Sequence, residues 1–429
     1  MARRRPAPPA LASEPVEVEL VDAAFGGEAI GRLPDGRVVF VPRALPGERA
    51  LVQPVEERRD FARGELVRLG RAVPGRVEPP CQHYRQGCGG CSWQHADYAL
   101  QLRIKEEVVV DQLRRIGRFQ QPEALVKATI GMLEPWHYRN QARFTVGRKF
   151  GELCFTYRSS HRLLRVEHCW IVHPRINALL EHIQGRLPID RRIHQLSIRV
   201  GANTGALLIA PALPELGDVE SGQPFLEEEL LGRRFRLSPP SFFQVNTRRE
   251  QRPLPAAVSR AWLELPEDGL SMAEILALLV LDRLEPRQSD LVVDAYSGVG
   301  TFALLLAGCV GEVIGIEEAR SAISDAVENG RDAGNVSFVQ ARTEDALPEL
   351  RRRPDAVILD PARVGAHPAV LAALLSLRPR RIVYVSCDPS TLARDLRVLV
   401  DGGYTLGEVQ PLDMFPQTYH VECVATLTL

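Results

Sequence analysis

LVVDAYSGVGT (residues 291–301) is the segment that best predicts the fold of the C-terminal part of this chain. Its apolar first half predicts a buried strand that ends at Asp294, and its second half is a glycine turn ahead of a helical stretch. Gly298 and Gly300 carry no side chains, so a ligand can approach the backbone where that helix begins. From about Ser238 onward, strand and helix patterns alternate as in a parallel sheet. The C-terminal part is therefore predicted to be a Rossmann-like α/β domain that binds a nucleotide-like ligand.

The acids that follow the next strands indicate the kind of ligand. The run 312–316 ends at Glu317, roughly 20 residues beyond the turn, where an acid can bind both hydroxyls of a ribose. A pyrophosphate site would carry a third glycine, and Asp294 would repel a phosphate. S-adenosylmethionine has no phosphate and therefore fits better than a dinucleotide. The run 356–359 ends at Asp360, whose carboxylate suits a cationic sulfonium.

A thiol follows another predicted strand. Cys387 comes directly after the apolar run 382–385, and Glu422 lies downstream. A thiol at the carboxyl end of a strand lies at the edge of the sheet where open α/β folds bind ligands. Cys387 and Glu422 are thus a candidate nucleophile and base. The alternatives are a small buried cysteine and a surface glutamate.

Composition limits the class of protein. The chain has 429 residues, 45% of them apolar and 25% charged, which predicts a soluble globular protein of two or three domains. Its net charge of -1 gives no global basic field, so a nucleic acid would have to be bound by local arginine patches. The sequence contains neither an apolar run of the roughly 18 residues that cross a membrane nor a secretion signal, so we expect a cytoplasmic protein.

The chain divides into four segments. Residues 1–13, rich in Arg, Pro and Ala, are predicted to form a disordered basic tail. Residues 14–73 alternate short strand patterns with Gly and Pro turns, which indicates a small β-barrel. Residues 74–237 mix strand and helix patterns, and the helix expected at 98–119 could pack on the catalytic domain instead. Residues 238–429 form the α/β domain.

Four of the eight cysteines form a candidate metal site. Cys81, Cys88 and Cys91 lie in one short loop, and Cys169 would be the fourth ligand. Four thiolates suit either zinc or a [4Fe-4S] cluster, and their spacing does not choose between the two.

These motifs, in this order, resemble the RNA uracil-5-methyltransferase family. The resemblance is to the bacterial large-subunit ribosomal RNA members that carry an N-terminal OB-like TRAM barrel and an iron-sulfur cluster. It covers nearly the whole chain. The segments that carry it are GRLPDGRVVFVPRALPGE (31–48), CQHYRQGCGGCSWQ (81–94), SPPSFFQVN (238–246), DAYSGVGTF (294–302), DPARVG (360–365), SCDPSTLARD (386–395) and QTYHVE (417–422).

The resemblance implies a role for each matching residue. Cys387 would add to C6 of uracil, which makes C5 reactive enough to accept the methyl group. Glu422 would then remove the C5 proton. A thiol is only slightly ionised at neutral pH, so we expect Arg363 and Arg394 to favour the thiolate. The residues implied in binding S-adenosylmethionine are Gln244, Tyr296, Gly298, Gly300, Thr301, Glu317 and Asp360. The implied ligands of a structural [4Fe-4S] cluster are Cys81, Cys88, Cys91 and Cys169.

The implied partner is RNA. The barrel favours 23S ribosomal RNA, with transfer RNA as the alternative, and the run 138–143 would help to grip a single strand. We expect a monomer with no membrane or DNA partner. A non-catalytic RNA-binding iron-sulfur protein and an RNA cytosine-5-methyltransferase are the rival interpretations. The presence of both Cys387 and Glu422 speaks against the first, and their sequence context favours uracil over cytosine.

Overall fold

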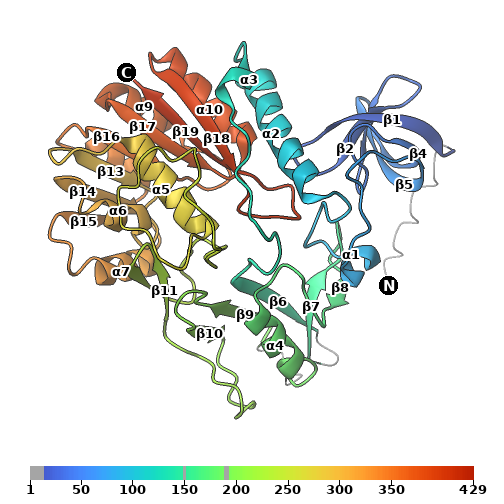
Figure 1. The fold of residues 1–429 in the computed structure, drawn as a ribbon, viewed down its shortest axis with the longest axis horizontal. Helices are drawn as coiled ribbons and strands as arrows, with labels where there is room; N and C mark the ends of the chain where they lie inside the picture. Colours follow the sequence, from blue (N-terminus) through green and yellow to red (C-terminus); the bar gives the residue numbers. More distant parts are fainter. Residues whose placement is uncertain (1–13, 148–150, 188–192) are drawn as a thin grey trace, which may run out of the picture.

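The computed structural model describes residues 14–147, 151–187 and 193–429 (Figure 1). The predicted basic tail, residues 1–13, lies outside the described residues. In the described part of the chain, no helix combines the length and apolarity that crossing a membrane requires.

The N-terminal strands close into a barrel, which confirms the predicted β-barrel. Its strands are hydrogen-bonded in the order β1-β2-β3-β5-β4. Their bounds are β1 (Val16–Ala23), β2 (Ala29–Arg32), β3 (Val38–Val41), β4 (Arg49–Glu57) and β5 (Phe61–Arg71). Alternate residues such as Val18, Leu20 and Val52 fill the interior, as expected where one face of each strand is buried.

The central part is a mixture of helices and an antiparallel sheet. The sheet has the order β10-β9-β6-β7-β8, and a hairpin of β11 and β12 follows it. The strands are β6 (Gln141–Gly147), β7 (Glu152–Thr156), β8 (Leu163–Arg165), β9 (Gln195–Val200), β10 (Leu207–Ala210), β11 (Leu226–Leu230) and β12 (Arg233–Leu237). The helices are α1 (Gln82–Gln86), α2 (Tyr98–Arg115), α3 (Pro122–Leu125) and α4 (Pro174–Ile183).

The C-terminal domain is built on a seven-stranded sheet of order β15-β14-β13-β16-β17-β19-β18. Its strands are β13 (Leu291–Ala295), β14 (Glu312–Glu317), β15 (Val336–Gln340), β16 (Ala356–Leu359), β17 (Arg381–Ser386), β18 (Thr405–Leu412) and β19 (Glu422–Thr428). Its helices are α5 (Met272–Leu284), α6 (Thr301–Leu306), α7 (Arg320–Asn329), α8 (Thr343–Ala346), α9 (Pro368–Leu377) and α10 (Pro389–Asp401). The first five strands of that order are parallel, whereas β19 is antiparallel to both neighbours.

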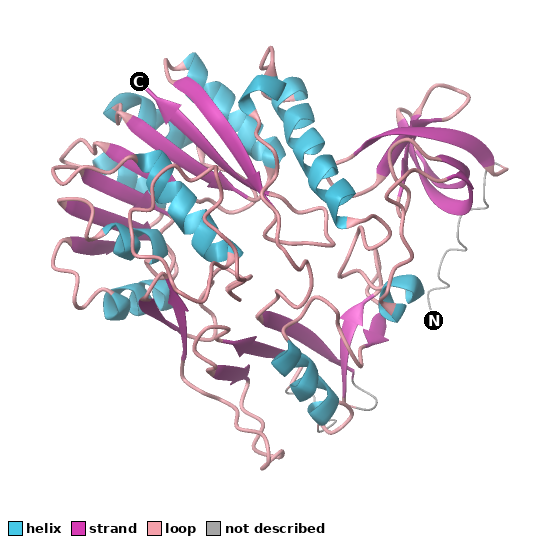
Figure 2. Cartoon of the chain, viewed as in Figure 1, coloured by secondary structure: helices cyan, strands magenta, loops and turns pink. Residues whose placement is uncertain are grey.

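Helices cover both faces of this sheet (Figure 2). Side chains of α5 and α6 share one apolar core with strand residues such as Val292 and Val383. Side chains of α9 and α10 share the other core with Val293 and Tyr384. Alternate residues of a buried strand point to opposite faces, so strands such as β13 and β17 contribute to both cores. The predicted Rossmann-like domain is confirmed.

Helix α2 precedes the central sheet in the sequence but packs on the C-terminal domain (Figure 1). It contacts α10 and β18, and its residues Val109 and Leu113 belong to the core beneath α9 and α10. Two polar residues on its buried face, Gln101 and Lys105, are 1% and 0% exposed. Burying a charge is costly unless it is paired, so these positions must have partners.

Candidate active site

The predicted site residues gather at one edge of the seven-stranded sheet. Tyr296, Glu317, Asp360 and Cys387 lie at or directly after the carboxyl ends of β13, β14, β16 and β17, which are parallel. Because β19 runs in the opposite direction, its first residue, Glu422, lies at the same edge. This edge is where open α/β sheets bind their ligands.

Strand pairing brings Cys387 and Glu422 together. Ser386 on β17 pairs with Cys423 on β19, so continuing that register by one residue sets Cys387 opposite Glu422. The chain then turns away at Asp388, whose side chain accepts hydrogen bonds from N–H groups in the first turn of α10 at 2.9 and 3.1 Å. This cap fixes the backbone just after the thiol.

The groups around the thiol are mainly acidic. The pKa of Cys387 is raised to about 12, mainly by burial and then by the carboxyl groups of Glu422 and Asp360, whereas Arg363 lowers it. Burial likewise raises the pKa of Asp360 to about 7 and that of Glu422 well above its ordinary value. Arg363 acts on the thiol in the expected direction, but burial and the acidic neighbours outweigh it, so the pKa of Cys387 is raised overall. The second expected cation, Arg394, instead pairs with the neighbouring Asp395 at 2.8 Å.

Backbone hydrogen bonds shape the glycine turn. Asp294 Oδ2 accepts the N–H of Ala303 in α6 at 2.9 Å, and Glu317 Oε2 accepts the N–H of Gly298 at 3.1 Å. Gly298 and Gly300 have φ angles of 56° and 86°, in the left-handed region that favours glycine. The turn is thereby tied to the end of β14.

The same turn offers room and free polar atoms for a ligand. A Cβ at Gly298 would have no heavy atom within 4 Å. Ser297 Oγ and Asp294 Oδ1 are buried and have no hydrogen-bond partner among the described residues. Burial raises the pKa of Asp294 to about 7. Such atoms are normally satisfied, so the turn fits a polar cofactor such as S-adenosylmethionine.

The remaining predicted residues are Thr301, which directly follows the glycine turn, and Gln244 and the four cysteines, which line a separate cavity. Thr301 is the first residue of α6 and is half-buried. Gln244 lines a cavity of about 580 Å³ together with Arg363. The other residues that line this cavity include Cys81, Cys88, Cys91, Cys169, Arg139, Arg143, Phe242 and Phe415. One cavity thus brings the four cysteines together with Gln244 and Arg363, whereas Asp360, Cys387 and Glu422 are not among the residues that line it.

The four thiols lie near one another but do not form a closed ligand shell. The pKa of Cys169 is raised to about 11, mainly by burial, and the thiols of Cys88 and Cys81 contribute to this increase. Burial also raises the pKa of Cys91, with the other three thiols contributing. Even so, no three or more His, Cys, Asp or Glu side chains within the described ranges converge as metal ligands do. The residue types fit a metal.

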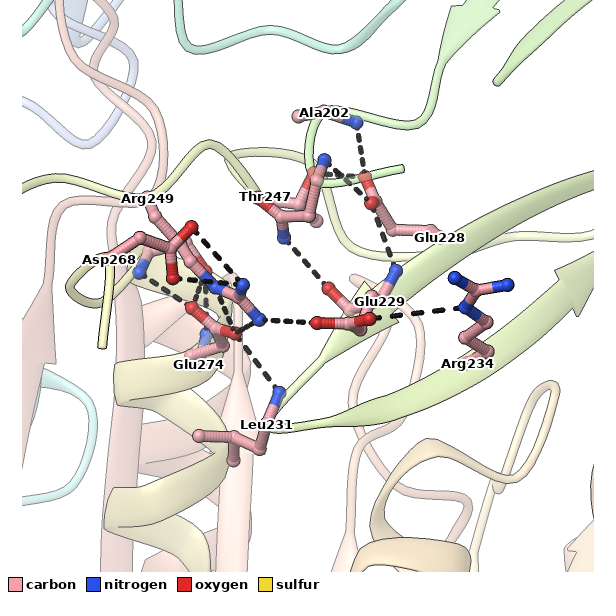
Figure 3. Close-up of polar contacts among 11 residues, drawn as sticks. Ala202, Glu228, Glu229, Leu231, Arg234, Thr247, Arg249, Asp268 and Glu274 are labelled. Atoms are coloured by element: carbon pink, nitrogen blue, oxygen red, sulfur yellow. Dashed lines mark hydrogen bonds and ion pairs between the residues drawn. The ribbon is translucent and has the colours of Figure 1, made fainter. Parts of the chain in front are cut away.

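A larger cavity, of about 900 Å³, lies between the β11–β12 hairpin and residues 263–268. No predicted site residue lines it. Figure 3 shows why its wall is polar: Arg249 bonds to Glu274, Glu229 and Asp268 at 2.8, 3.1 and 3.0 Å. These carboxylates accept the hydrogen bonds of the Arg249 guanidinium. We therefore interpret the network as a structural link between the hairpin and α5 and not as a ligand site.

Comparisons with known proteins agree with this geometry. The family model for tRNA (Uracil-5-)-methyltransferase matches residues 271–429, and that for the TRAM domain matches residues 13–67. An uncharacterized RNA methyltransferase of Gloeobacter violaceus is 36% identical, with 97% of each chain covered. Another, of Halalkalibacterium halodurans, is 33% identical, with 98% of each chain covered. The chain belongs to the TRAM-containing RNA uracil-5-methyltransferase family.

A solved structure shares the fold of this methyltransferase along its length. The tRNA (uracil-54, C5)-methyltransferase of Pyrococcus abyssi, in complex with S-adenosyl-L-homocysteine, has a TM-score of 0.69 and 23% sequence identity. The match covers 96% of this chain and 100% of that one, so it includes the barrel. An N-terminal barrel therefore occurs in an enzyme named for transfer RNA, and it does not by itself separate the two kinds of RNA substrate.

The two glycines should respond differently to alanine. Gly298→Ala places its methyl in open space, so we expect a loss of stability of about 1 kcal/mol from the left-handed backbone, together with weaker S-adenosylmethionine binding. Gly300→Ala would set a Cβ 2.7 Å from the Phe338 ring and should cost roughly 1–3 kcal/mol more. Urea unfolding and calorimetric titration measure both effects. Equal losses of stability in the two variants would contradict the prediction that only the Cβ at position 300 meets a neighbouring side chain.

Proposed function

We propose that this protein transfers a methyl group from S-adenosylmethionine to C5 of a uridine in RNA, through a transient bond between Cys387 Sγ and C6. The observation that carries the proposal is the pairing of β17 with β19, which sets a thiol and a buried carboxyl group side by side. They share the sheet edge with a glycine turn that has room for a cofactor.

In the proposed reaction, Cys387 acts first as the nucleophile and Glu422 acts last as the base. Cys387 Sγ, as thiolate, adds to C6 and places negative charge on C5 and its neighbouring carbonyl oxygen. When bound, S-adenosylmethionine supplies an electrophilic methyl group to C5 and leaves as S-adenosylhomocysteine. Glu422 then takes the C5 proton, and the electron pair of the C5–H bond forms the C5–C6 double bond as the C6–S bond breaks. The raised pKa of Glu422 makes its carboxylate a stronger base.

All of the proposed cofactor residues except Gln244 lie in the glycine turn or at the ends of the neighbouring strands and helix. Glu317 would bind the ribose, since each of its oxygens accepts one backbone N–H and has capacity for a hydroxyl. Asp360 would lie near the sulfonium, whose positive charge offsets the cost of burying a carboxylate. The remaining residues that we propose for this site are Gln244, Tyr296, Gly298, Gly300 and Thr301.

The cavity next to this edge suits a single-stranded polyanion. Arg139 and Arg143 line it, and no carboxylate in the described part of the chain lies within ion-pair distance of either. Phe242, 67% exposed, lies on the same wall and could stack on a base. We propose that a loop of RNA enters here with its target uridine turned out toward Cys387.

We propose 23S ribosomal RNA as the substrate on the resemblance of the whole motif set to the ribosomal RNA members. Transfer RNA is the second candidate. The structural similarity to the Pyrococcus abyssi enzyme, whose name specifies uracil-54 of tRNA, favours it.

We also propose that Cys81, Cys88, Cys91 and Cys169 hold a [4Fe-4S] cluster with a structural role, with zinc as the alternative metal. Their common cavity and their mutual effect on thiol pKa support this proposal. Two hydrogen bonds fix the backbone of the loop. Arg158 donates to Cys91 O at 2.7 Å, and Cys88 N donates to His83 O at 2.8 Å.

The catalytic proposal predicts two distinct phenotypes. Cys387→Ala should abolish methyl transfer and still bind S-adenosylmethionine, because the thiol touches only the uracil. Glu422→Gln should methylate C5 but retain the C6–S bond, so a covalent RNA adduct accumulates. Labelled S-adenosylmethionine with ribosomal or transfer RNA, nucleotide mapping and a denaturing gel measure both. Turnover at the wild-type rate by either variant would refute its assigned role.

Arg363→Met should shift the pH dependence of adduct formation. The reactive species is the thiolate, and with a thiol pKa of about 12 its fraction rises with pH across the neutral range. Arg363 lowers that pKa, so removing it should raise the pKa and move the profile to higher pH, with a rate loss on the order of tenfold per pKa unit at fixed pH. Arg394→Met, whose guanidinium pairs with Asp395, is the control and should leave the profile in place.

The metal proposal predicts a cysteine-specific loss of metal. Protein purified without oxygen should contain iron and sulfide and absorb visible light, and Cys91→Ser should lose both signals. Cys309→Ser, at a half-buried cysteine outside the cavity, should lose neither. Zinc without visible absorbance would establish the alternative metal, and the absence of any bound metal would refute the site.

A further inference from the structure

We propose that Gln101 and Lys105 of α2 are positioning residues for Glu422, acting through the segment 413–421 that joins β18 to β19. The inference rests on the proposed function, because it takes Glu422 as the base. Neither side chain is among the residues that line the cavity beside the site, so their effect on the reaction would be indirect.

Gln101 and Gln417 form a reciprocal pair of hydrogen bonds. Gln101 Nε2 donates to Gln417 Oε1, and Gln417 N donates to Gln101 Oε1, each at 2.9 Å. The two residues are 1% and 3% exposed. Gln417 has a φ angle of 68°, which residues with a side chain rarely adopt. Surrounding contacts must hold such a backbone in place, and Gln101 supplies two of them.

Lys105 fixes the start of the same segment. Its Nζ donates to Asp413 Oδ1 at 2.5 Å and to Phe415 O at 3.2 Å. The Lys105 and Asp413 side chains are both 0% exposed. Asp413 Oδ1 also accepts the N–H of Phe415 at 3.1 Å. Because removing one partner of such a buried pair leaves an uncompensated charge, the pair holds the segment firmly.

Other parts of the N-terminal half bind the segment as well. Gln417 O accepts the N–H groups of Ser92 and Trp93 at 2.8 and 3.0 Å, and Pro416 O accepts the hydroxyl of Tyr138 at 3.1 Å. The backbone that leads into Glu422 is thus fixed largely by residues that precede the sheet. Gln101 lies at the centre, since its Nε2 also donates to Trp93 O at 3.3 Å.

A displaced base would slow one step selectively. Addition of the thiolate and transfer of the methyl group come before the C5 proton is removed, and Glu422 acts only in that removal. A misplacement on the order of 1 Å can cost about 100-fold in rate. Loosening the segment should therefore slow elimination and leave the methylated adduct attached to Cys387.

The test compares two buried glutamines in the full-length protein. Gln101→Met removes the bonds to Gln417 at similar volume. Gln410→Met is the matched control, because Gln410 is 2% exposed and donates to Ala128 O at 2.7 Å and Pro411 O at 3.0 Å, outside segment 413–421. With S-adenosylmethionine and the RNA that the wild type methylates, Gln101→Met should slow elimination about 10- to 100-fold and accumulate the covalent adduct, as Glu422→Gln does. The control should release its product like the wild type.

A second variant tests the same proposal in case Gln101→Met does not fold. Lys105→Met combined with Asp413→Leu removes both buried charges, so the protein should fold, and it should trap the adduct in the same way. If Gln101→Met and the control lose activity in parallel without trapping, or if the double variant eliminates normally, the positioning role is overturned. If Glu422→Gln itself traps no adduct, the proposed base assignment fails, and this inference fails with it.

Discussion

The antiparallel pairing of β19 with β17 is the constraint on which the candidate active site depends. A purely parallel sheet would carry the start of β19 to the opposite edge, away from the thiol. Insertion of β19 in the reverse direction between β17 and β18 instead delivers Glu422 to the edge where Cys387 and Asp360 directly follow their strands. One reversal of strand direction therefore creates the proposed nucleophile and base pair.

This arrangement raises the pKa values of both the proposed base and the proposed nucleophile. Burial together with Asp360 raises the pKa of Glu422, and the same acids raise that of Cys387. A carboxylate with a raised pKa is a better base, whereas a thiol with a raised pKa is less often ionised. In the proposed reaction, the raised pKa of Glu422 would favour removal of the C5 proton once its carboxylate is ionised, whereas the raised pKa of Cys387 would disfavour formation of the thiolate. Arg363 lowers the pKa of both groups.

The sequence allowed prediction of features that local patterns determine. Asp360 and Cys387 each follow an apolar strand, so their common edge could be predicted from the parallel order of the strands. The thiol pKa could not, because it depends on the burial of Cys387 and on how closely Glu422 and Asp360 approach it after folding. Gln101 and Lys105 share the buried face of α2, which marks them as needing partners. Those partners lie 316 and 308 residues away, and no spacing rule in the sequence identifies them.

The contacts of Gln417 connect the cysteine loop to the segment that leads into Glu422. Ser92 and Trp93 directly follow Cys91, and their N–H groups bind the carbonyl of Gln417. Trp93 Nε1 donates to Gly27 O at 3.0 Å, which extends the same connection to the barrel. A change in the conformation of the cysteine loop must therefore move the strained backbone at Gln417 or break its hydrogen bonds. Because that backbone leads into Glu422, correct folding of the cysteine loop and correct placement of the proposed base are one structural requirement.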